Sequence, residues 1–522
     1  MPYSSRTYSG HPDPALTLSE ALRRGAAAHP DSRLVLHSPD EMVVTDLART
    51  HELSLRVATA LAERGVVAGD VVAVQLPNGL PSLVAHAAVL LRGAVLLPVV
   101  SIYGTAELTF ILRQSGATTL ITSADRAAEV LDSHPYDDPR DVVAVGPTPP
   151  AKSTPWSTLV DTIPNVRAAV DDRDPDDIAA LLYTSGTTGE PKGVRHTHRS
   201  LLAEIRSMPN APGQGGAYLN PFPPGHIASL GAMLRTLTLG IPTVFLQKWD
   251  ADAALDLITA YGVTASGGVP FHLAGLLDAA ERSGRGLGSL RDYLVGAAGV
   301  APVLIERAHA VGLAAYRAYG SSEHPTITSG RPDDPLAWRA FTDGRAMPGS
   351  EIRIVGFDGR DAGPGEDGEI LSRGPEMFVG YSDPDLTANV ITDDGWLRTG
   401  DIGRLDENGC LTITDRLKDI IVRGGEKIAS KEVEDILATH PAVAEVAAVA
   451  EPDVRYGEHV CVFVVVRAGS TFGLDDVRAH FAAASVARQK TPERVVIVPE
   501  LPRTPAGKIR KQPLRNRLAT SA

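Results

Sequence analysis

A repeated succession of helix, glycine turn and buried strand is the pattern that most constrains the fold. One copy spans Leu83 to Val100 and a second spans Leu304 to Ala318. In a third copy, Asp250 is placed to cap a helix that Gly262 ends just before the next apolar strand. Alternation of this kind is typical of layered α/β domains in which most strands are buried. The sequence therefore predicts an α/β fold.

The length and a change of pattern near the C-terminus predict two domains. A chain of 522 residues is too long for a single hydrophobic core. We expect a large N-terminal domain of layered β/α subdomains over residues 1–415 and a small α+β domain over residues 416–522. The second domain has compact strands such as 460–466 and a helix that we expect Ser430 to cap. The Pro- and Asp-rich stretch 133–156 is interpreted as a surface connection and not as a further boundary.

The composition is that of a globular protein with an acidic surface. Hydrophobic residues make up 43% and charged residues 22% of the chain, which argues against extensive disorder. The formal charge of −13 disfavours nucleic acid and anionic membranes as partners. Cys410 and Cys461 are far apart and lack metal-ligand spacing. The N-terminus has no apolar signal, and the most apolar run, residues 83–100, contains His86, Arg92 and Pro98, so we expect a cytoplasmic protein without integral membrane association.

A loop rich in glycine and hydroxyl side chains follows a predicted strand. Residues 184–193 read Thr-Ser-Gly-Thr-Thr-Gly-Glu-Pro-Lys-Gly. Hydroxyls and backbone amides donate hydrogen bonds to phosphate, Gly186 and Gly189 let the main chain approach it, and Lys192 supplies positive charge. The loop is not a P-loop, because proline precedes Lys192 and glycine follows it. We interpret it as a polyphosphate-binding loop of another kind.

Five further motifs follow this loop. They are Tyr319-Gly-Ser-Ser-Glu323, Thr399-Gly-Asp401, Asp415-Arg-Leu-Lys418, Gly424-Gly-Glu-Lys-Ile428 and Pro505-Ala-Gly-Lys-Ile509. In this order the six motifs resemble those of the AMP-binding superfamily, which includes acyl-CoA synthetases, peptide-synthetase adenylation domains and beetle luciferases. The resemblance covers nearly the whole chain. It implies an acyl-CoA synthetase of the fatty-acid or aryl-acid branch, which uses ATP and Mg²⁺ to form an acyl adenylate, releases pyrophosphate and then makes a thioester with coenzyme A.

The resemblance implies an ATP site made of several motifs. Thr184 and Glu323 are expected to bind Mg²⁺ through hard oxygen ligands, and Asp401 is expected to bind the ribose hydroxyls. Ser322 stands where threonine is more common, and it retains the hydroxyl. The complete set expected to contact ATP or AMP comprises Thr184, Ser185, Gly186, Thr187, Thr188, Lys192, Ala298, Gly299, Tyr319, Gly320, Ser321, Ser322, Asp401 and Arg416.

The resemblance also implies catalytic and mobile parts. An ammonium placed between the carboxylate and the α-phosphate lowers the repulsion between two anions, and Lys508 is expected to supply it. Lys418 is the expected hinge of a mobile C-terminal domain, and Gly424 and Gly425 are expected to line the channel for the coenzyme A thiol. The residues expected to act in catalysis are Lys508, Glu323, His226 and Arg416.

The side chains expected to line the acyl pocket are small or apolar, and His226 is expected to border the pocket. Its wall is assigned by motif position to His226, Leu230, Gly231, Ala297 and Ala298. The segment around His226 lacks the aspartate with which amino-acid-activating relatives hold an ammonium, so a neutral aliphatic or aromatic acid is expected. Two alternatives stay open: transfer of the acyl group to a carrier protein or another nucleophile, and a nucleotide-binding regulator without turnover.

Overall fold

The structure is a computed structural model that describes residues 15–133, 141–171, 173–184, 191–208, 212, 215–484, 486–503 and 509–519. Within these residues the chain forms two compact units. The first holds residues up to 184, 191–351 and 373–395, and the second holds 352–372 and 396 onward. The predicted domain boundary after residue 415, and the predicted mobility of residues 416–522, stay predictions.

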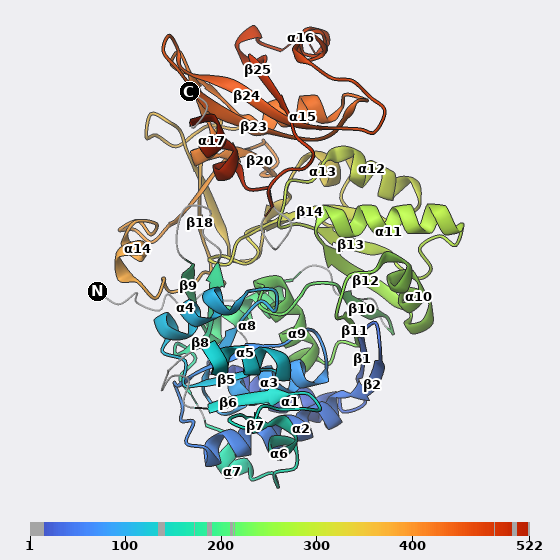
Figure 1. Ribbon diagram of the computed structural model, residues 1–522, viewed down its shortest axis with the longest axis vertical. Helices are drawn as coiled ribbons and strands as arrows, with labels where there is room; N and C mark the ends of the chain where they lie inside the picture. The colour runs from blue at the N-terminus through green and yellow to red at the C-terminus, as the bar shows by residue number, and fades with distance from the viewer. Residues whose placement is uncertain are drawn as a thin grey trace. The chain divides into compact units, whose positions relative to one another are not determined.

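A nine-stranded sheet forms one half of the first unit (Figure 1). Its order is β16-β15-β14-β13-β12-β10-β11-β1-β2, and neighbours from β14 to β1 run parallel. The strands are β1 (Arg33–His37), β2 (Met42–Asp46), β10 (Ala217–Asn220), β11 (Thr243–Leu246), β12 (Val263–Gly268), β13 (Asp292–Val295), β14 (Ala314–Tyr319), β15 (Thr328–Ser329) and β16 (Arg345–Ala346). The parallel run confirms the predicted β/α architecture.

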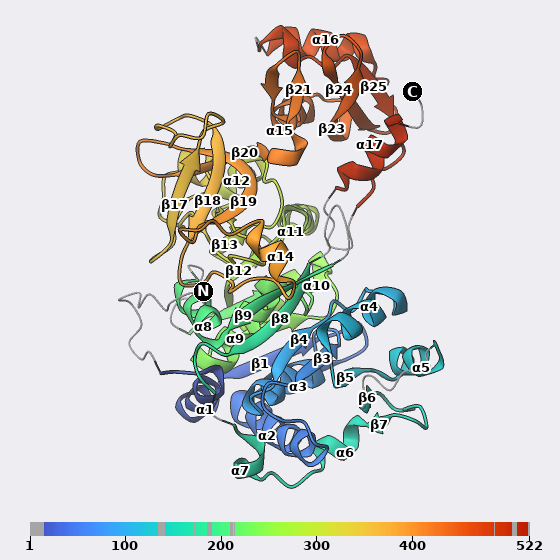
Figure 2. The same ribbon diagram turned by 90° about the vertical axis from the view of Figure 1, so that its left-hand side faces the viewer.

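A seven-stranded sheet in the order β7-β6-β5-β3-β4-β8-β9 forms the other half (Figure 2). Its strands are β3 (Val71–Gln75), β4 (Val95–Pro98), β5 (Thr119–Ser123), β6 (Asp141–Val145), β7 (Thr154–Pro155), β8 (Ile178–Thr184) and β9 (Lys192–Thr197). Strands β6 and β7 lie inside the stretch 133–156, so its interpretation as a surface connection is wrong. The short apolar run 142–145 extends the sheet, and pairing with β5 buries it.

Fourteen helices of the described residues belong to the first unit. The predicted caps are confirmed, because Asp250 accepts a hydrogen bond from the amide of Ala253 at 2.9 Å and Gly262 ends the helix with φ 63°. The helices are α1 (Leu18–Ala28), α2 (Leu47–Glu63), α3 (Leu80–Leu91), α4 (Thr105–Ser115), α5 (Ala124–Ser133), α6 (Trp156–Val160), α7 (Val166–Ala169), α8 (His198–Ser207), α9 (Ile227–Leu239), α10 (Ala251–Tyr261), α11 (Pro270–Ser283), α12 (Pro302–Ala310), α13 (Leu336–Phe341) and α14 (Pro384–Ala388).

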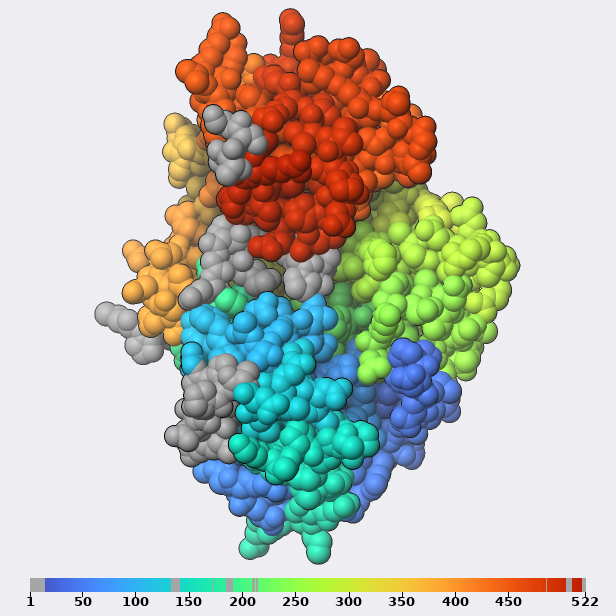
Figure 3. Space-filling model, in the orientation of Figure 1, coloured from blue at the N-terminus to red at the C-terminus, as the bar shows by residue number. Residues whose placement is uncertain are grey.

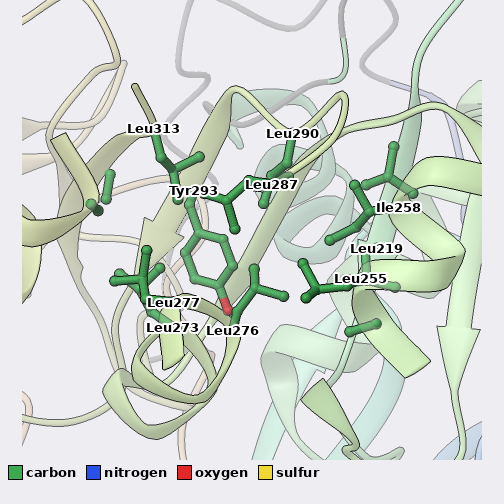
Figure 4. Packing of buried hydrophobic residues seen from close by; sticks show 14 of the residues in the cluster. Leu219, Leu255, Ile258, Leu273, Leu276, Leu277, Leu287, Leu290, Tyr293 and Leu313 are labelled. Atoms are coloured by element: carbon green, nitrogen blue, oxygen red, sulfur yellow. The ribbon is translucent and has the colours of Figure 1, made fainter. Parts of the chain in front are cut away.

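Leucine side chains of α11 pack against the nine-stranded sheet. Leu273, Leu276 and Leu277 are spaced to share one face of the helix, and they lie around the buried ring of Tyr293 on β13 (Figure 4). Burial of such side chains stabilises the fold by roughly 1.5–3 kcal/mol each. This packing fixes the strands whose ends carry the predicted site.

The second unit contains two antiparallel sheets. One has the order β17-β18-β19-β20, and the other has the order β22-β21-β24-β23 with β25 beside β24. The elements are β17 (Glu351–Val355), β18 (Gly368–Arg373), β19 (Leu397–Leu405), β20 (Leu411–Arg416), η1 (Leu417–Asp419), β21 (Ile421–Arg423), β22 (Glu426–Ile428), α15 (Ser430–Ala438), β23 (Val443–Asp453), β24 (Gly457–Val466), α16 (Leu474–Ala483), η2 (Arg488–Lys490), β25 (Arg494–Ile497) and α17 (Lys511–Ala519). None of the described helices in either unit has the length and apolar character needed to cross a membrane.

The expected cap at Ser430 is wrong. Helix α15 begins at Ser430 itself, and Ala429 is the cap residue without a capping side chain. The hydroxyl of Ser430 donates instead to Asp415 at 3.1 Å, and its amide donates to the same carboxylate. A tertiary partner thus takes the place of the local capping bond.

Candidate functional site

The predicted phosphate loop is closed at its base by two antiparallel strands. Thr184 is the last residue of β8, Lys192 is the first of β9, and the two are paired across the hairpin. The pairing holds a hydroxyl and an ammonium group at the two sides of the loop base. The predicted phosphate-binding residues Ser185, Gly186, Thr187 and Thr188 lie outside the described residues.

Tyr381 lies between Lys192 and Glu323. The ammonium of Lys192 is 5.4 Å from the centroid of the Tyr381 ring, and the Tyr381 hydroxyl donates to Oε1 of Glu323 at 2.7 Å. Burial first and the charge of Glu323 second raise the pKa of Tyr381, so its hydroxyl remains a donor. The amide of Phe378 also donates to the carbonyl of Glu323 at 2.8 Å. The segment around Tyr381 therefore orients the predicted magnesium ligand, a role that no local sequence pattern indicates.

The motif that contains Glu323 is tightly folded. A Cβ atom on Gly320 would lie 1.8 Å from the carbonyl oxygen of Pro325, so only glycine fits there. The hydroxyl of Ser321 accepts hydrogen bonds from the amides of Glu323 and His324 at 3.1 and 3.3 Å. Tyr319, the last residue of β14, is buried with 8% of its surface exposed. The turn fixes the backbone around Glu323 before any ligand binds.

His196 joins this motif to the strand that carries Lys192. Its Nε2 lies 2.7 Å from the carbonyl oxygen of Ser322, and its Nδ1 lies 3.1 Å from the hydroxyl of Ser200. Burial lowers the pKa of His196 to about 4, so the ring is neutral at pH 7. We assign the proton to Nε2, because a carbonyl oxygen can only accept. No motif of the sequence marks His196 as part of the site.

Three of the predicted segments follow the carboxyl ends of parallel strands of one sheet. His226 follows β10, residues 297–299 follow β13, and Tyr319 ends β14. In the sheet β10, β12, β13 and β14 are consecutive and parallel (Figure 1). Ligands of open α/β sheets bind at this edge, so the fold brings the predicted acyl and adenine segments to the appropriate side.

Two features of these segments support a binding role. Ala297 has φ 64°, and among the described residues it is the one non-glycine residue in the left-handed region. Such backbone strain is concentrated at functional sites. Residues 297–299 are exposed, whereas Leu230 and Gly231 are buried in α9, which His226 precedes as the cap residue. The predicted acyl residues therefore include both an accessible loop and a buried helix face.

A buried pair of carboxyl groups lies beside Gly231. A Cβ atom on Gly231 would lie 3.8 Å from Oε1 of Glu204, which accepts a hydrogen bond from the Thr326 hydroxyl at 3.0 Å. Glu204 interacts with Glu376, whose Oε1 accepts a hydrogen bond from the Ser207 hydroxyl. Burial first and the charge of Glu204 second raise the pKa of Glu376. We assign the shared proton to Glu376, because two adjacent buried carboxylates cannot both be ionised.

Replacing Glu376 with glutamine is expected to weaken the pH dependence of stability. The folded chain keeps a proton on Glu376 that the unfolded chain releases above pH 4.5, so the stability contributed by this group falls as pH rises. Glutamine keeps a donor toward Glu204 and does not titrate. Between pH 6 and 8 the wild type should lose about 3 kcal/mol of unfolding free energy relative to the variant. Urea unfolding of the wild type and the variant at several pH values tests this prediction, with Glu306→Gln at an exposed position as the control. Parallel plots of unfolding free energy against pH for the wild type and Glu376→Gln would contradict it.

Two predicted residues of the second unit form an ion pair. Asp401 on β19 is paired in register with Arg416 on β20, and Nε of Arg416 is 3.1 Å from Oδ1 of Asp401. Asp401 is nearly buried, with 9% of its surface exposed. The next predicted residue, Lys418, lies in the 3₁₀ turn η1, where burial first and Arg416 second lower its pKa. The antiparallel ladder thus brings together the groups expected at ribose and at the hinge.

The predicted thiol-channel residues form a two-residue hairpin turn. Gly424 and Gly425 connect β21 with β22 and have φ 59° and 90°, respectively. Two consecutive positive φ values are typical of a type I′ turn, which strongly favours glycine. The amide of Gly424 donates to the carbonyl of Tyr456 at 2.8 Å. The predicted catalytic Lys508 lies outside the described residues.

The fold and the six motifs define the class of adenylate-forming enzymes. Residues 22–382 match the family model of AMP-binding enzymes, and residues 432–508 match that of the AMP-binding enzyme C-terminal domain. The chain therefore belongs to the AMP-binding enzyme family.

Known proteins of this family resemble the chain over nearly its full length. A medium-chain fatty-acid–CoA ligase of Escherichia coli strain K12 is 35% identical over 91% of this chain and 88% of its own. A salicylyl-CoA synthase/salicylate adenylyltransferase of Streptomyces is 35% identical over 88% and 86%. The structure of o-succinylbenzoate CoA synthetase from Bacillus subtilis, in complex with its acyl-adenylate intermediate, is 27% identical with a TM-score of 0.82 over 95% of this chain and 97% of its own.

These similarities confirm the predicted enzyme class. The protein is an AMP-forming acyl-CoA synthetase that uses ATP, Mg²⁺ and coenzyme A. It converts a small carboxylic acid to an acyl adenylate with release of pyrophosphate, and then to a coenzyme A thioester. The alternative of a regulator without turnover is thereby disfavoured.

Proposed function

We propose that this synthetase activates a neutral aliphatic or aromatic acid at the carboxyl edge of the nine-stranded sheet. The observation that carries the proposal is the connected set of Lys192, Tyr381 and Glu323, in which Lys192 is paired with Thr184 across the base of the predicted phosphate loop. An ammonium, a hydroxyl and an oriented carboxylate are the groups that a magnesium-bound triphosphate requires.

The residues at this place fit a magnesium ion. Glu323 offers a carboxylate of which one oxygen accepts from Tyr381, and Thr184 offers a hydroxyl; both are hard oxygen ligands. We propose that these two residues hold the ion, which would neutralise phosphate charge when bound. Asp401 is proposed to accept hydrogen bonds from the ribose hydroxyls, with the ion pair to Arg416 holding its carboxylate in place.

In the first half-reaction, a carboxylate oxygen of the acid attacks the α-phosphorus of ATP. The new P–O bond forms as the bond to the bridging oxygen breaks, and pyrophosphate leaves with the electron pair. Lys192 is proposed to hold the departing phosphates, and Lys508 to stabilise charge between carboxylate and α-phosphate. His226 is proposed to border the acyl carboxylate, because it precedes the helix that carries Leu230 and Gly231.

In the second half-reaction, the sulfur of coenzyme A attacks the acyl carbon and AMP leaves, while the thiol proton passes to solvent. We propose that residues 416–522 turn about Lys418 between the two steps and bring the Gly424–Gly425 hairpin to the acyl adenylate. The location of Lys418 in a short turn between β20 and β21 supports a hinge, because few residues there need to change conformation.

The wall residues support a neutral substrate. Leu230, Gly231, Ala297 and Ala298 carry no charge, and relatives of this chain are named for a medium-chain fatty acid and for salicylate. We place the enzyme in the cytoplasm, where ATP and coenzyme A are available and where its two buried cysteines would stay reduced. The net charge of −13 supports the absence of a nucleic-acid partner.

Acid-dependent ATP–pyrophosphate exchange over a panel of acids tests this function. We expect exchange with medium-chain fatty acids or aryl acids and none with α-amino acids, and mass spectrometry should detect a thioester once coenzyme A is added. Exchange without a thioester would favour transfer to a carrier protein or another nucleophile. Exchange that occurs only with amino acids would contradict the proposed pocket.

A further inference from the structure

Gly231 of α9 faces the end of helix α8 across a narrow gap. Helices α8 and α9 pack against each other, and Gly231 is buried where they meet. A Cβ atom on Gly231 would lie 3.5 Å from the sulfur of Met208 and 3.8 Å from Oε1 of Glu204. These are ordinary van der Waals distances, so the gap holds about one methyl group. Glu204 and Met208, here named the α8 wall, therefore lie directly opposite the predicted acyl wall at Gly231.

Buried polar contacts hold the α8 wall in place. Arg235 lies one turn after Gly231 on α9, is 4% exposed and donates to the sulfur of Met208 at 3.7 Å. The carboxylate of Glu204 is also 4% exposed and accepts the hydrogen bond of the Thr326 hydroxyl at 3.0 Å. A movement of Glu204 would leave buried polar groups without partners, which costs their full desolvation penalty. The wall is therefore rigid at its carboxylate.

A short, fixed loop connects the α8 wall with the proposed metal site. Thr326 lies three residues after Glu323, the proposed magnesium ligand. The next amide, that of Ile327, donates to the carbonyl of Tyr319 at 2.9 Å, so the loop is closed at its base. The distance from the metal site to the α8 wall is thus set by a few residues of folded backbone. An acid whose carboxylate lies beside the α-phosphate has a limited length available for the rest of its chain.

We propose that Glu204 and Met208 end the acyl pocket opposite Gly231, so that the enzyme selects its acid by length and favours compact aryl acids and short or medium aliphatic acids. The inference rests on the proposed function, in which the acyl group binds along α9. The thioether of Met208 packs well against apolar and aromatic groups, whereas the fixed carboxylate of Glu204 stops a longer chain. One methylene too many at such a wall lowers kcat/KM by about 10- to 200-fold.

Gly231→Ala tests the wall because it fills the gap without straining the fold. Alanine favours a helix interior more than glycine does, so the variant should be at least as stable as the wild type. ATP–pyrophosphate exchange is measured over a series of straight-chain and aryl acids. We expect kcat/KM for the best wild-type acid to fall at least about tenfold, the optimum to move to acids about one or two carbons shorter, and KM for ATP to stay within about twofold.

Gly275→Ala is the matched control for this substitution. Gly275 lies inside α11, where a Cβ atom would likewise lie 3.5 Å from its nearest neighbour, Nε1 of Trp249. Helix α11, yellow-green in Figure 3, reaches the surface of the first unit and carries no predicted acyl residue. The chain-length profile of this variant should match that of the wild type.

Met208→Ala tests the wall from the opposite side. It removes the side chain beyond Cβ and thereby lengthens the pocket, so acids about one to three carbons longer than the wild-type optimum should gain at least about tenfold in kcat/KM. Met42→Ala is the control, because it removes the same side chain from the edge strand β2, where Met42 is 51% exposed. Its chain-length profile should not change.

Several outcomes would overturn the inference. An unchanged chain-length profile in folded Gly231→Ala would show that the gap does not border the acid, and an equal decrease for acids of every length would show a general effect on catalysis. Wild-type activity that rises continuously with chain length would show that the wall sets no limit. If Gly231→Ala does not fold, Met208→Ala decides, and no gain for longer acids would refute the proposal. Wild-type protein without exchange for any acid would instead contradict the proposed function.

Discussion

Lys508→Ala is expected to lower acid-dependent ATP–pyrophosphate exchange by at least about a hundredfold, which is the usual effect of removing one group that stabilises transition-state charge. The reason is electrostatic: without the ammonium, the acid carboxylate and the α-phosphate approach each other as two anions with no nearby positive charge to reduce their repulsion. Conversion of supplied acyl adenylate to thioester should remain within a few-fold of the wild type, because that step needs no such charge at the phosphate.

Rapid-quench measurement of both half-reactions in Lys508→Ala checks this division. Lys152→Ala removes an exposed lysine of the first unit and serves as the control for loss of a positive charge. An equal decrease in both half-reactions would contradict the assignment, because a residue that acts only in adenylation has no role once the adenylate is supplied.

Glu323→Gln is expected to reduce adenylation by roughly a hundredfold and to raise the concentration of Mg²⁺ needed for half-maximal exchange. Glutamine retains an oxygen that accepts from Tyr381, so the motif should stay folded while the negative charge that attracts the metal is lost. Exchange rates measured against free Mg²⁺ at saturating ATP give both quantities.

Tyr381→Phe is the matched control for the carboxylate. It removes the 2.7 Å hydrogen bond to Glu323 and leaves the ring beneath Lys192, so the expected loss is about tenfold, the value of one misaligned hydrogen bond. An unchanged Mg²⁺ dependence in Glu323→Gln would show that the carboxylate is not a metal ligand.

Local patterns predicted the elements that position the site. Asp250 and Gly262 bound α10 as predicted, because hydrogen bonds between near neighbours decide these ends. The strand at 141–145 was missed within the stretch 133–156, since a short apolar run in a proline-rich sequence is distinguished from a loop only by its pairing with β5.

The sequence by itself determined the family, the α/β class and the order of the motifs, since each follows from residue types that recur at fixed, short spacings along the chain. Only the tertiary structure decided which distant groups meet. Tyr381 reaches Glu323, His196 reaches Ser322, and Arg515 reaches the turn at Lys418, although from 58 to 126 residues separate the partners. The physical reason is that such contacts depend on the path of the whole chain between packed sheets, whereas caps and turns depend on a few consecutive dihedral angles.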